Sequence, residues 1–140
     1  MITDPRKSGT KVVIIGAGSV GASIAFAMSI SQLCSNLVLI DVNASKAMGE
    51  AMDINHGLPF LGQMQVRAGD YSDCKDSDVI IITAGIPRKP GETRLDLARK
   101  NVELGRQITQ NIMKYYNHGV ILVVSNPVDV MTYMITHLLQ

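Results

Sequence analysis

One stretch of the sequence decides the predicted fold: Lys11-Val-Val-Ile-Ile-Gly-Ala-Gly-Ser-Val-Gly21. Its first half is an apolar run rich in β-branched residues, which is typical of a parallel strand buried on both faces. Its second half follows the pattern Gly-x-Gly-x-x-Gly and opens a predicted helix. Here Gly16 permits a tight turn, Gly18 lets the backbone approach a pyrophosphate, and Gly21 lets the helix pack closely on the strand. The free N–H groups and the positive end of the helix dipole would then face the anion.

A second buried strand, residues 36–41, ends on Asp41, twenty residues beyond Gly21. A carboxylate at this position accepts hydrogen bonds from the hydroxyls of an adenosine ribose and repels a 2′-phosphate. The two motifs together therefore predict a dinucleotide site that prefers NAD to NADP. In the alternative interpretation, the glycines only permit close packing and Asp41 only caps its strand.

The remaining apolar runs alternate between strand and helix patterns along the chain. Strands are predicted at 63–68, 78–83 and 120–124, and helices at 19–31, 43–57, 95–115 and from 127 onward. This alternation predicts an α/β fold, a doubly wound and mostly parallel sheet of the Rossmann type with helices on both faces. The 140 residues divide into an N-terminal arm, 1–10, and one dinucleotide-binding domain, 11–140.

Local signals mark the ends of these predicted helices. Asn43 is a predicted N-cap, and Thr93 and Asp96 have the spacing of a capping box. Gly119 is predicted to stop the long third helix, and Pro127 suits the first position of the last helix.

The composition excludes several classes of function. Thirteen Lys and Arg against 12 Asp and Glu leave a net charge of +1, which provides no general field for nucleic acid or an anionic membrane. The 29 uncharged residues between Lys11 and Asp41 are interrupted by glycine and serine, which favours a strand, a turn and a buried helix over a membrane span. Cys34 and Cys74 are too few for a disulfide framework or a zinc site and suit a cytoplasmic protein. The acidic stretch 70–78 lacks the glycine and the final glutamate of a calcium loop, so it is interpreted as a solvated connection and no metal site is predicted.

A basic, proline-rich loop follows the fourth predicted strand, from Gly85 to Arg94. It holds Arg88, Lys89 and Arg94, and an arginine fork can grip a carboxylate or polarise a carbonyl. Its prolines and glycines suit a stiff lid with pivots. A solvated loop without a ligand explains the same composition. Asn126, after the fifth strand, would lie on the same edge, where it either caps the next helix or binds a ribose or substrate oxygen.

Several longer motifs are more specific than the glycine turn. They are Ile15-Gly-Ala-Gly-Ser-Val-Gly-Ala-Ser23, Asp41-Val-Asn43, Lys46-Ala-Met-Gly-Glu-Ala-Met-Asp-Ile-Asn-His-Gly57, Thr83-Ala-Gly85, Lys89-Pro-Gly-Glu-Thr-Arg-Leu-Asp-Leu97 and Asn126-Pro-Val-Asp-Val130. In these motifs the chain resembles the NAD-dependent lactate/malate dehydrogenase family, and within it the bacterial L-lactate dehydrogenases, over essentially all of residues 11–140. The resemblance implies an oxidoreductase that binds NAD and transfers hydride reversibly between NADH and a small 2-keto acid.

The resemblance also implies roles for individual residues. Arg94 matches the lid arginine that stabilises charge on the substrate carbonyl oxygen, Asn126 matches an asparagine that hydrogen-bonds the same oxygen, and Arg88 occupies the position that selects the substrate. The family's cofactor contacts map onto Val20, Asp41, Lys46, Tyr71, Gly85, Ile86, Ser125 and Asn126, beside the motif glycines Gly16, Gly18 and Gly21.

Arg88 departs from the lactate pattern. Lactate dehydrogenases usually have glutamine there, whereas malate dehydrogenases have an arginine that pairs with the second carboxylate of oxaloacetate. The flanking Gly-Glu-Thr-Arg94 and the motif from Lys46 to Gly57 are lactate-like. Pyruvate is therefore the predicted substrate, with oxaloacetate as the alternative.

Two parts that the resemblance requires do not occur in the chain: a proton-donating histidine oriented by an aspartate, and a second arginine for the substrate carboxylate. None of His56, His118 and His137 stands in such a motif. The chain is therefore interpreted as the cofactor-binding part of a longer enzyme, whose C-terminal catalytic domain lies outside it. A stand-alone NAD-binding module and a structural domain with a vestigial nucleotide site are the alternatives. The resemblance further implies a cytoplasmic homotetramer or dimer that serves glycolysis and fermentation.

Overall fold

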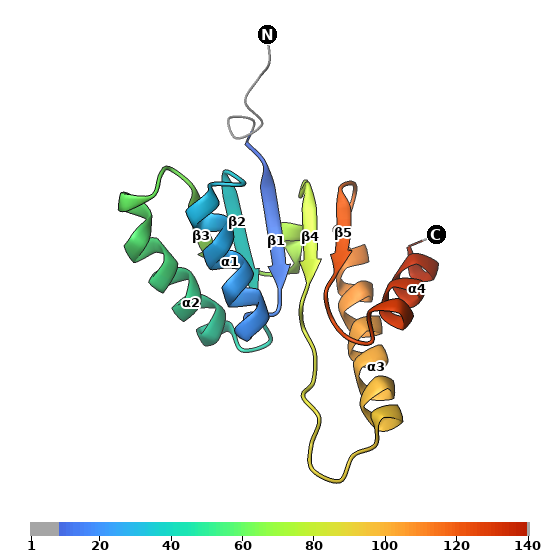
Figure 1. Ribbon diagram of the computed structural model, residues 1–140. Helices are drawn as coiled ribbons and strands as arrows, with labels where there is room; N and C mark the ends of the chain where they lie inside the picture. Colours follow the sequence, from blue (N-terminus) through green and yellow to red (C-terminus); the bar gives the residue numbers. More distant parts are fainter. Residues whose placement is uncertain (1–8, 140) are drawn as a thin grey trace.

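The computed structural model describes residues 9–139, so most of the predicted arm, 1–10, lies outside the described residues. Strands and helices alternate along this part of the chain (Figure 1). The strands are β1 (Lys11–Ile15), β2 (Asn36–Ile40), β3 (Gln65–Ala68), β4 (Val79–Ile82) and β5 (Val120–Val123). The helices are α1 (Ser19–Ser31), α2 (Ala44–Gly57), α3 (Arg94–Met113) and α4 (Val128–Leu138), with the short 3-10 helices η2 (Leu58–Phe60) and η3 (Tyr71–Cys74).

The strands form one parallel sheet in the order β3-β2-β1-β4-β5. The register pairs Val13 of β1 with Val38 of β2 on one side and with Ile80 of β4 on the other. From β1 the chain continues to β2 and β3 on one side of the sheet and then to β4 and β5 on the other, so the strand order reverses between β1 and β4. Open α/β sheets bind ligands at such a reversal, beyond the carboxyl ends of the strands. The predicted α/β fold is confirmed.

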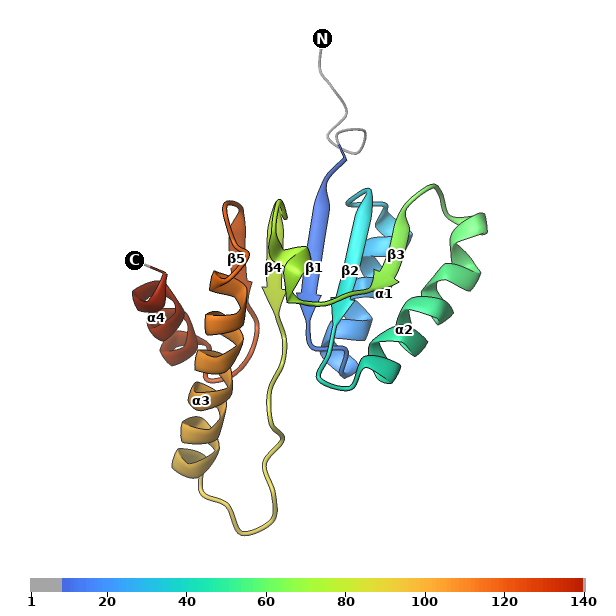
Figure 2. The same ribbon diagram turned by 180° about the vertical axis from the view of Figure 1, so that it is seen from behind.

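Helices lie on both faces of this sheet (Figures 1 and 2). On one face α1 and α2 cover β1, β2 and β3, and Ile14 of β1 belongs to a buried cluster with Ala51 of α2. On the other face α3 and α4 lie against β4 and β5, and Ile82 belongs to a second buried cluster with Ile112 of α3. Burial on two faces explains why the central strands are unbroken apolar runs instead of alternating patterns.

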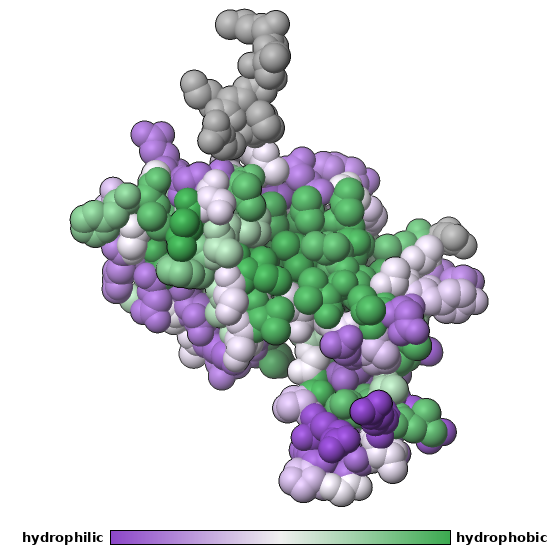
Figure 3. All heavy atoms as spheres, in the orientation of Figure 1, coloured by the Kyte–Doolittle hydropathy of each residue, from purple (hydrophilic) through white to green (hydrophobic). Residues whose placement is uncertain are grey.

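The outer strand β5 is less covered than the others. The side chains of Val120, Leu122 and, just after the strand, Val124 are 64%, 49% and 36% exposed. Apolar surface is visible over this part of the sheet on the face that carries α1 (Figure 3). Because parallel sheets are normally covered on both faces, this exposed face marks an unpartnered part of the domain.

The predicted helix starts are confirmed at two of the helices. The Oδ1 atom of Asn43 accepts the N–H of Lys46 at 3.1 Å at the start of α2. Thr93 and Asp96 form a capping box at the start of α3. These caps place Lys46 in the first turn of α2 and make Arg94 the first residue of α3.

Two other predicted helix boundaries are wrong: the end of α3 at Gly119 and the start of α4 at Pro127. The helix α3 ends at Met113, so Gly119 does not stop it. Gly119 instead lies directly before β5 with a φ of +102°, where a Cβ would come within 2.3 Å of the Ser77 carbonyl oxygen. Pro127 is extended and precedes α4, which begins at Val128. The proline therefore serves as the capping residue instead of the first helical residue.

Candidate functional site

A cavity of about 360 Å³ lies at the carboxyl ends of β1, β2 and β4, where the strand order reverses. This volume falls in the ordinary range of small-molecule sites, roughly 300–1,000 Å³. Predicted cofactor-binding residues from four separate segments line it: Gly16, Gly18, Asp41, Lys46, Tyr71, Gly85 and Ile86. The fold therefore brings together most of the cofactor-binding residues that the sequence predicts.

The glycine turn forms one wall of this cavity. Gly16 has a φ of +109°, and a Cβ there would lie 2.6 Å from the backbone nitrogen of Ala84. A Cβ at Gly21 would lie 1.8 Å from the carbonyl oxygen of Gly16, so only glycine lets α1 pack this closely on the turn. A Cβ at Gly18 would meet nothing within 4 Å, and Gly18 lines the cavity. The turn therefore leaves open space at the N-terminus of α1, where an anion is favoured.

Asp41 is fixed at the end of β2 by two backbone donors. Its Oδ2 atom accepts the N–H of Ala17 at 2.8 Å, and its Oδ1 atom accepts the N–H of Asn43 at 2.8 Å. Each oxygen of an ionised carboxylate keeps a further lone pair for a ligand hydroxyl. Asp41 thus binds its local backbone and also lines the cavity, so its backbone contacts do not prevent it from facing a ligand.

Tyr71 and Lys46 complete the wall near Asp41. Tyr71 is half-buried, and burial raises the pKa of its phenol; the nearby Cys74 and Asp41 raise it further, while a hydrogen bond with Asn111 opposes them. The phenol is therefore neutral at physiological pH. Lys46, exposed in the first turn of α2, adds a cationic side chain to the lining.

Two residues outside the predicted cofactor-binding set hold the cavity walls in place. The Oγ1 atom of Thr83 donates to the carbonyl oxygen of Gly16 at 2.9 Å and ties the glycine turn to the end of β4. Asn101 of α3 is 5% exposed; it accepts the N–H of Ile86 at 2.7 Å and donates to the Ile86 carbonyl oxygen at 3.4 Å. Asn101 lies on the buried face of α3 together with Ile108. Because buried polar groups are hydrogen-bonded, an asparagine on a buried helix face indicates a polar partner inside the protein.

The predicted substrate-binding residues are not gathered in this cavity. The loop after β4 extends beyond the ends of the strands before it returns to α3 (Figure 1). Arg88 and Arg94 are exposed and do not line the cavity. Asn126 is exposed after β5, and no side chain caps α4, so the alternative role of Asn126 as a helix cap is wrong.

Two further cofactor-binding candidates also lie outside the lining. Val20 is 52% exposed in the first turn of α1. Ser125 is buried, and its Oγ atom donates to the carbonyl oxygen of Ala84 at 2.6 Å. Ser125 therefore joins the end of β5 to the end of β4.

A family model described as the NAD-binding domain of lactate/malate dehydrogenase matches residues 10–138. The chain belongs to this family. As a lactate/malate dehydrogenase domain it takes NAD as its cofactor, which confirms the cofactor prediction. The open turn at Gly18 and the anchored carboxylate of Asp41 fit the pyrophosphate and a ribose of that cofactor.

Relatives of this lactate/malate dehydrogenase domain are found among bacterial enzymes. L-lactate dehydrogenase of Acetivibrio thermocellus is 51% identical over 124 residues, which cover 89% of this chain and 39% of the relative. L-lactate dehydrogenase 1 of Clostridium acetobutylicum is 49% identical over 128 residues, 91% of this chain and 41% of the relative. The chain therefore spans about two fifths of the length of these curated relatives.

Solved structures show the same relationship. The lactate dehydrogenase MGS-M5, from a Medee basin deep-sea metagenome library, is 47% identical with a TM-score of 0.88, covering 92% of this chain and 41% of that chain. The malate dehydrogenase of Picrophilus torridus is 36% identical with a TM-score of 0.87, covering 91% of this chain and 42% of that chain. Both branches of the family therefore share this fold.

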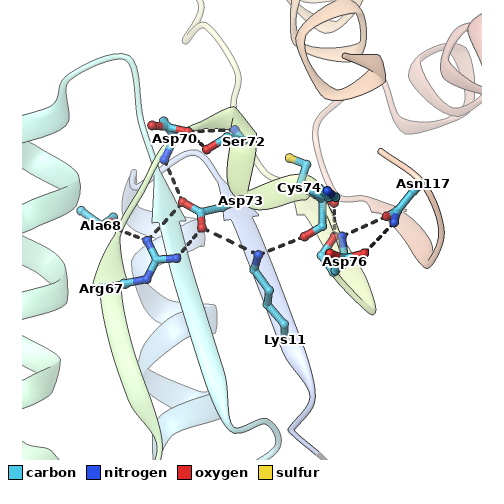
Figure 4. A network of polar contacts seen from close by, with 11 residues as sticks. Lys11, Arg67, Ala68, Asp70, Ser72, Asp73, Cys74, Asp76 and Asn117 are labelled. Carbon is cyan, nitrogen blue, oxygen red and sulfur yellow. Dashed lines mark hydrogen bonds and ion pairs between the residues drawn. The ribbon is translucent and has the colours of Figure 1, made fainter. Parts of the chain in front are cut away.

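The acidic stretch 70–78 of this dehydrogenase domain is more than a solvated connection, contrary to the prediction. The Asp73 side chain is 14% exposed and pairs with Arg67 and, at 3.7 Å, with Lys11 (Figure 4). Burial acts to raise the pKa of the Asp73 carboxyl, but hydrogen bonds from Arg67 and from the Asp70 N–H hold it below its ordinary value. The prediction failed because Lys11 lies on β1, far from Asp73 in sequence, and because the pairing with Arg67, six residues before Asp73, depends on how the connection after β3 folds.

The remaining reactive groups that the structure describes do not form a second site. Cys34 and Cys74 are buried, and burial raises the pKa of each thiol to about 11, so neither is an active nucleophile. Within residues 9–139, no group of His, Cys, Asp or Glu is placed to hold a metal ion. In the same part of the chain, no helix is both long and apolar enough to cross a membrane.

Proposed function

We propose that this domain belongs to an NAD-dependent L-lactate dehydrogenase, which transfers hydride reversibly between NADH and pyruvate. The observation that carries the proposal is the cavity in which a glycine turn, open at Gly18, faces a carboxylate fixed at Asp41. Identities of 47–51% to curated relatives named L-lactate dehydrogenase favour the lactate branch of the family.

In this proposal the cavity holds NAD across the glycine turn. The N–H groups at the start of α1 bind the pyrophosphate beside Gly18, and the Asp41 carboxylate accepts the hydroxyls of the adenosine ribose. Gly85 and Ile86, on the other side of the turn, shield the nicotinamide half from water. The nicotinamide supplies or accepts the hydride. The other proposed cofactor contacts are Val20, Lys46, Tyr71, Ser125 and Asn126.

The substrate would bind between the loop and the end of β5. Arg94 stabilises the negative charge that develops on the carbonyl oxygen of the keto acid, which is often the largest catalytic contribution. Asn126 donates a hydrogen bond to the same oxygen. Both side chains are exposed, so they are free to approach a keto acid placed against the nicotinamide.

The reaction also needs a histidine–aspartate proton relay and a second arginine for the substrate carboxylate. We place these groups in a C-terminal catalytic domain outside this chain. The curated relatives support this placement, since the matched part is 39–41% of their length.

We also propose that the enzyme is a cytoplasmic homotetramer that serves glycolysis and fermentation. Cys34 and Cys74 are free thiols, which suits a reducing compartment. Phe26 and Ile30 of α1 are 56% and 51% exposed, which supports contacts between copies. Reduction of pyruvate would return NAD to glycolysis.

A malate dehydrogenase is the second candidate, and Arg88 favours it. Arg88 is exposed and has no ion-pair partner among the residues that the structure describes. Lys89 beside it adds a second cation at the tip of the loop. A dicarboxylate such as oxaloacetate would give these charges a partner that pyruvate does not offer.

Steady-state reduction of pyruvate and oxaloacetate by the full-length protein separates the two candidates. We expect wild type to prefer pyruvate, and Arg88→Gln to lower oxaloacetate reduction by about tenfold or more, because one charge-assisted pair is lost. A large preference of wild type for oxaloacetate would contradict the lactate assignment. Bound NADH without turnover of either acid would favour a stand-alone NAD-binding module.

A further inference from the structure

Glu92 is the one acidic residue of the loop between β4 and α3, and its carboxylate is held on both oxygens. Its Oε2 atom accepts the N–H of Lys89 at 3.0 Å, and its Oε1 atom pairs with Nζ of Lys100 on α3. The Glu92 side chain is 16% exposed although the loop around it is open to solvent. The hydrogen bonds from Lys100 and from the Lys89 N–H lower the pKa of the Glu92 carboxyl, so it is ionised at neutral pH.

Lys100 and its neighbour Asn101 hold the two limbs of this loop. Asn101 hydrogen-bonds the backbone of Ile86 on the outgoing limb. Lys100 pairs with Glu92 on the returning limb. Two successive residues of α3 therefore attach the loop on both sides, and residues 87–91 form its tip.

This arrangement leaves the arginines of the loop without acidic partners. Arg88 and Arg94 form no ion pair within the described part of the chain. The other nearby acid is Asp96. Its carboxylate accepts hydrogen bonds from the N–H of Thr93 at 3.1 Å and from the Oγ1 atom of Thr93 at 2.6 Å. Glu92 lies four residues after Arg88 and two before Arg94, so a released Glu92 carboxylate would compete with the keto acid for either guanidinium.

We propose that Lys100 is a positioning residue that binds Glu92 and thereby keeps the loop arginines available for a keto acid substrate. Lys100 itself does not contact the substrate; it acts through Glu92. The inference rests on the proposed function, because a keto acid is the ligand for which the arginines are kept free.

Lys100→Gln in the full-length enzyme is expected to raise the KM for pyruvate about threefold to fivefold, the scale of one exposed ion pair, and to leave the KM for NADH unchanged. Glu92→Gln together with Lys100→Gln removes the competing charge and is expected to restore the KM for pyruvate. Lys100→Arg is expected to keep the KM for pyruvate at the wild-type value. Arg106→Gln is the matched control, because Arg106 is another cation of α3 and pairs with Glu103, 3.9 Å away, instead of with the loop.

An unchanged KM for pyruvate in Lys100→Gln would overturn the inference. So would a double variant as impaired as the single one, since removing Glu92 cannot repair a purely structural defect. A wild-type enzyme that reduces neither pyruvate nor oxaloacetate is a distinct outcome: it would overturn the proposed function, and this inference with it.

Discussion

Gly21→Ala is expected to lower the free energy of unfolding by about 3 kcal/mol or more, at the upper end of overpacking effects. The added Cβ would lie 1.8 Å from the carbonyl oxygen of Gly16. That peptide cannot easily retreat, because the Gly16 N–H donates to the Ile40 carbonyl at 2.7 Å and the Gly16 carbonyl accepts from Thr83 at 2.9 Å. Either α1 or the turn must therefore move away from the sheet.

Gly49→Ala is the matched control for this substitution. Gly49 is exposed within α2, and a Cβ there would meet nothing within 4 Å. Alanine is expected to stabilise the protein at this position by about 0.5–1 kcal/mol. Thermal unfolding followed by circular dichroism should show a midpoint roughly 10 °C lower for Gly21→Ala and slightly higher for Gly49→Ala. Equal midpoints would mean that the turn tolerates a side chain.

Asp41→Ser is expected to weaken NADH binding about tenfold to hundredfold, because charge-assisted hydrogen bonds to the ribose are lost. One hydroxyl also cannot replace both carboxylate oxygens that accept the N–H groups of Ala17 and Asn43. NADPH should bind more tightly than it does to wild type, since the charge that repels a 2′-phosphate is gone. Fluorescence titrations with NADH and NADPH measure both changes.

Asp41→Asn separates the charge from the shape of this side chain. The amide keeps one oxygen for a backbone N–H but removes the negative charge, so the gain in NADPH affinity should remain while the loss in NADH affinity is smaller. Asp53→Ser is the control, because Asp53 is an exposed acid of α2 that does not line the cavity. If Asp41→Ser keeps the wild-type ratio of NADH to NADPH affinity, the proposed contact between Asp41 and the adenosine ribose is contradicted.

The cofactor half of the site could be predicted from the sequence because its parts are local. The glycines from Gly16 to Gly21 lie directly after β1, and Asp41 lies directly after β2. Parallel strands in register carry such residues to the same edge of the sheet. Fold and cavity therefore follow from short-range patterns in the sequence.

The supporting contacts could not be predicted in this way. Thr83 reaches Gly16 across 67 positions of sequence, and Asn101 reaches Ile86 across 15. Such contacts depend on strand register and on how α3 packs, which apolar periodicity does not specify. A local signal can also mislead: Gly119 has the positive φ of a turn before β5, and its place after a helical pattern suggested a helix stop.

The substrate half of the site is the least determined by sequence. Arg88 lies in a loop without periodic pattern and Arg94 begins α3 directly after it, so their positions depend on the attachments of that loop to α3. Asn126 lies on the next connection, and neither Asn126 nor either arginine lines the cavity. Local spacing identifies these side chains as candidates but does not place them relative to one another.

The assignment of the cavity to NAD is tested most directly by backbone amide chemical shifts of the labelled protein during titration with NADH and, separately, with AMP. We expect NADH to shift the amides of Gly18 and Asn43 on one side and of Ile86 on the other. AMP should shift Gly18 and Asn43 but leave Ile86 in place. No shifts, or shifts confined to the separate cavity lined by Tyr116 and Ile121, would contradict the assignment.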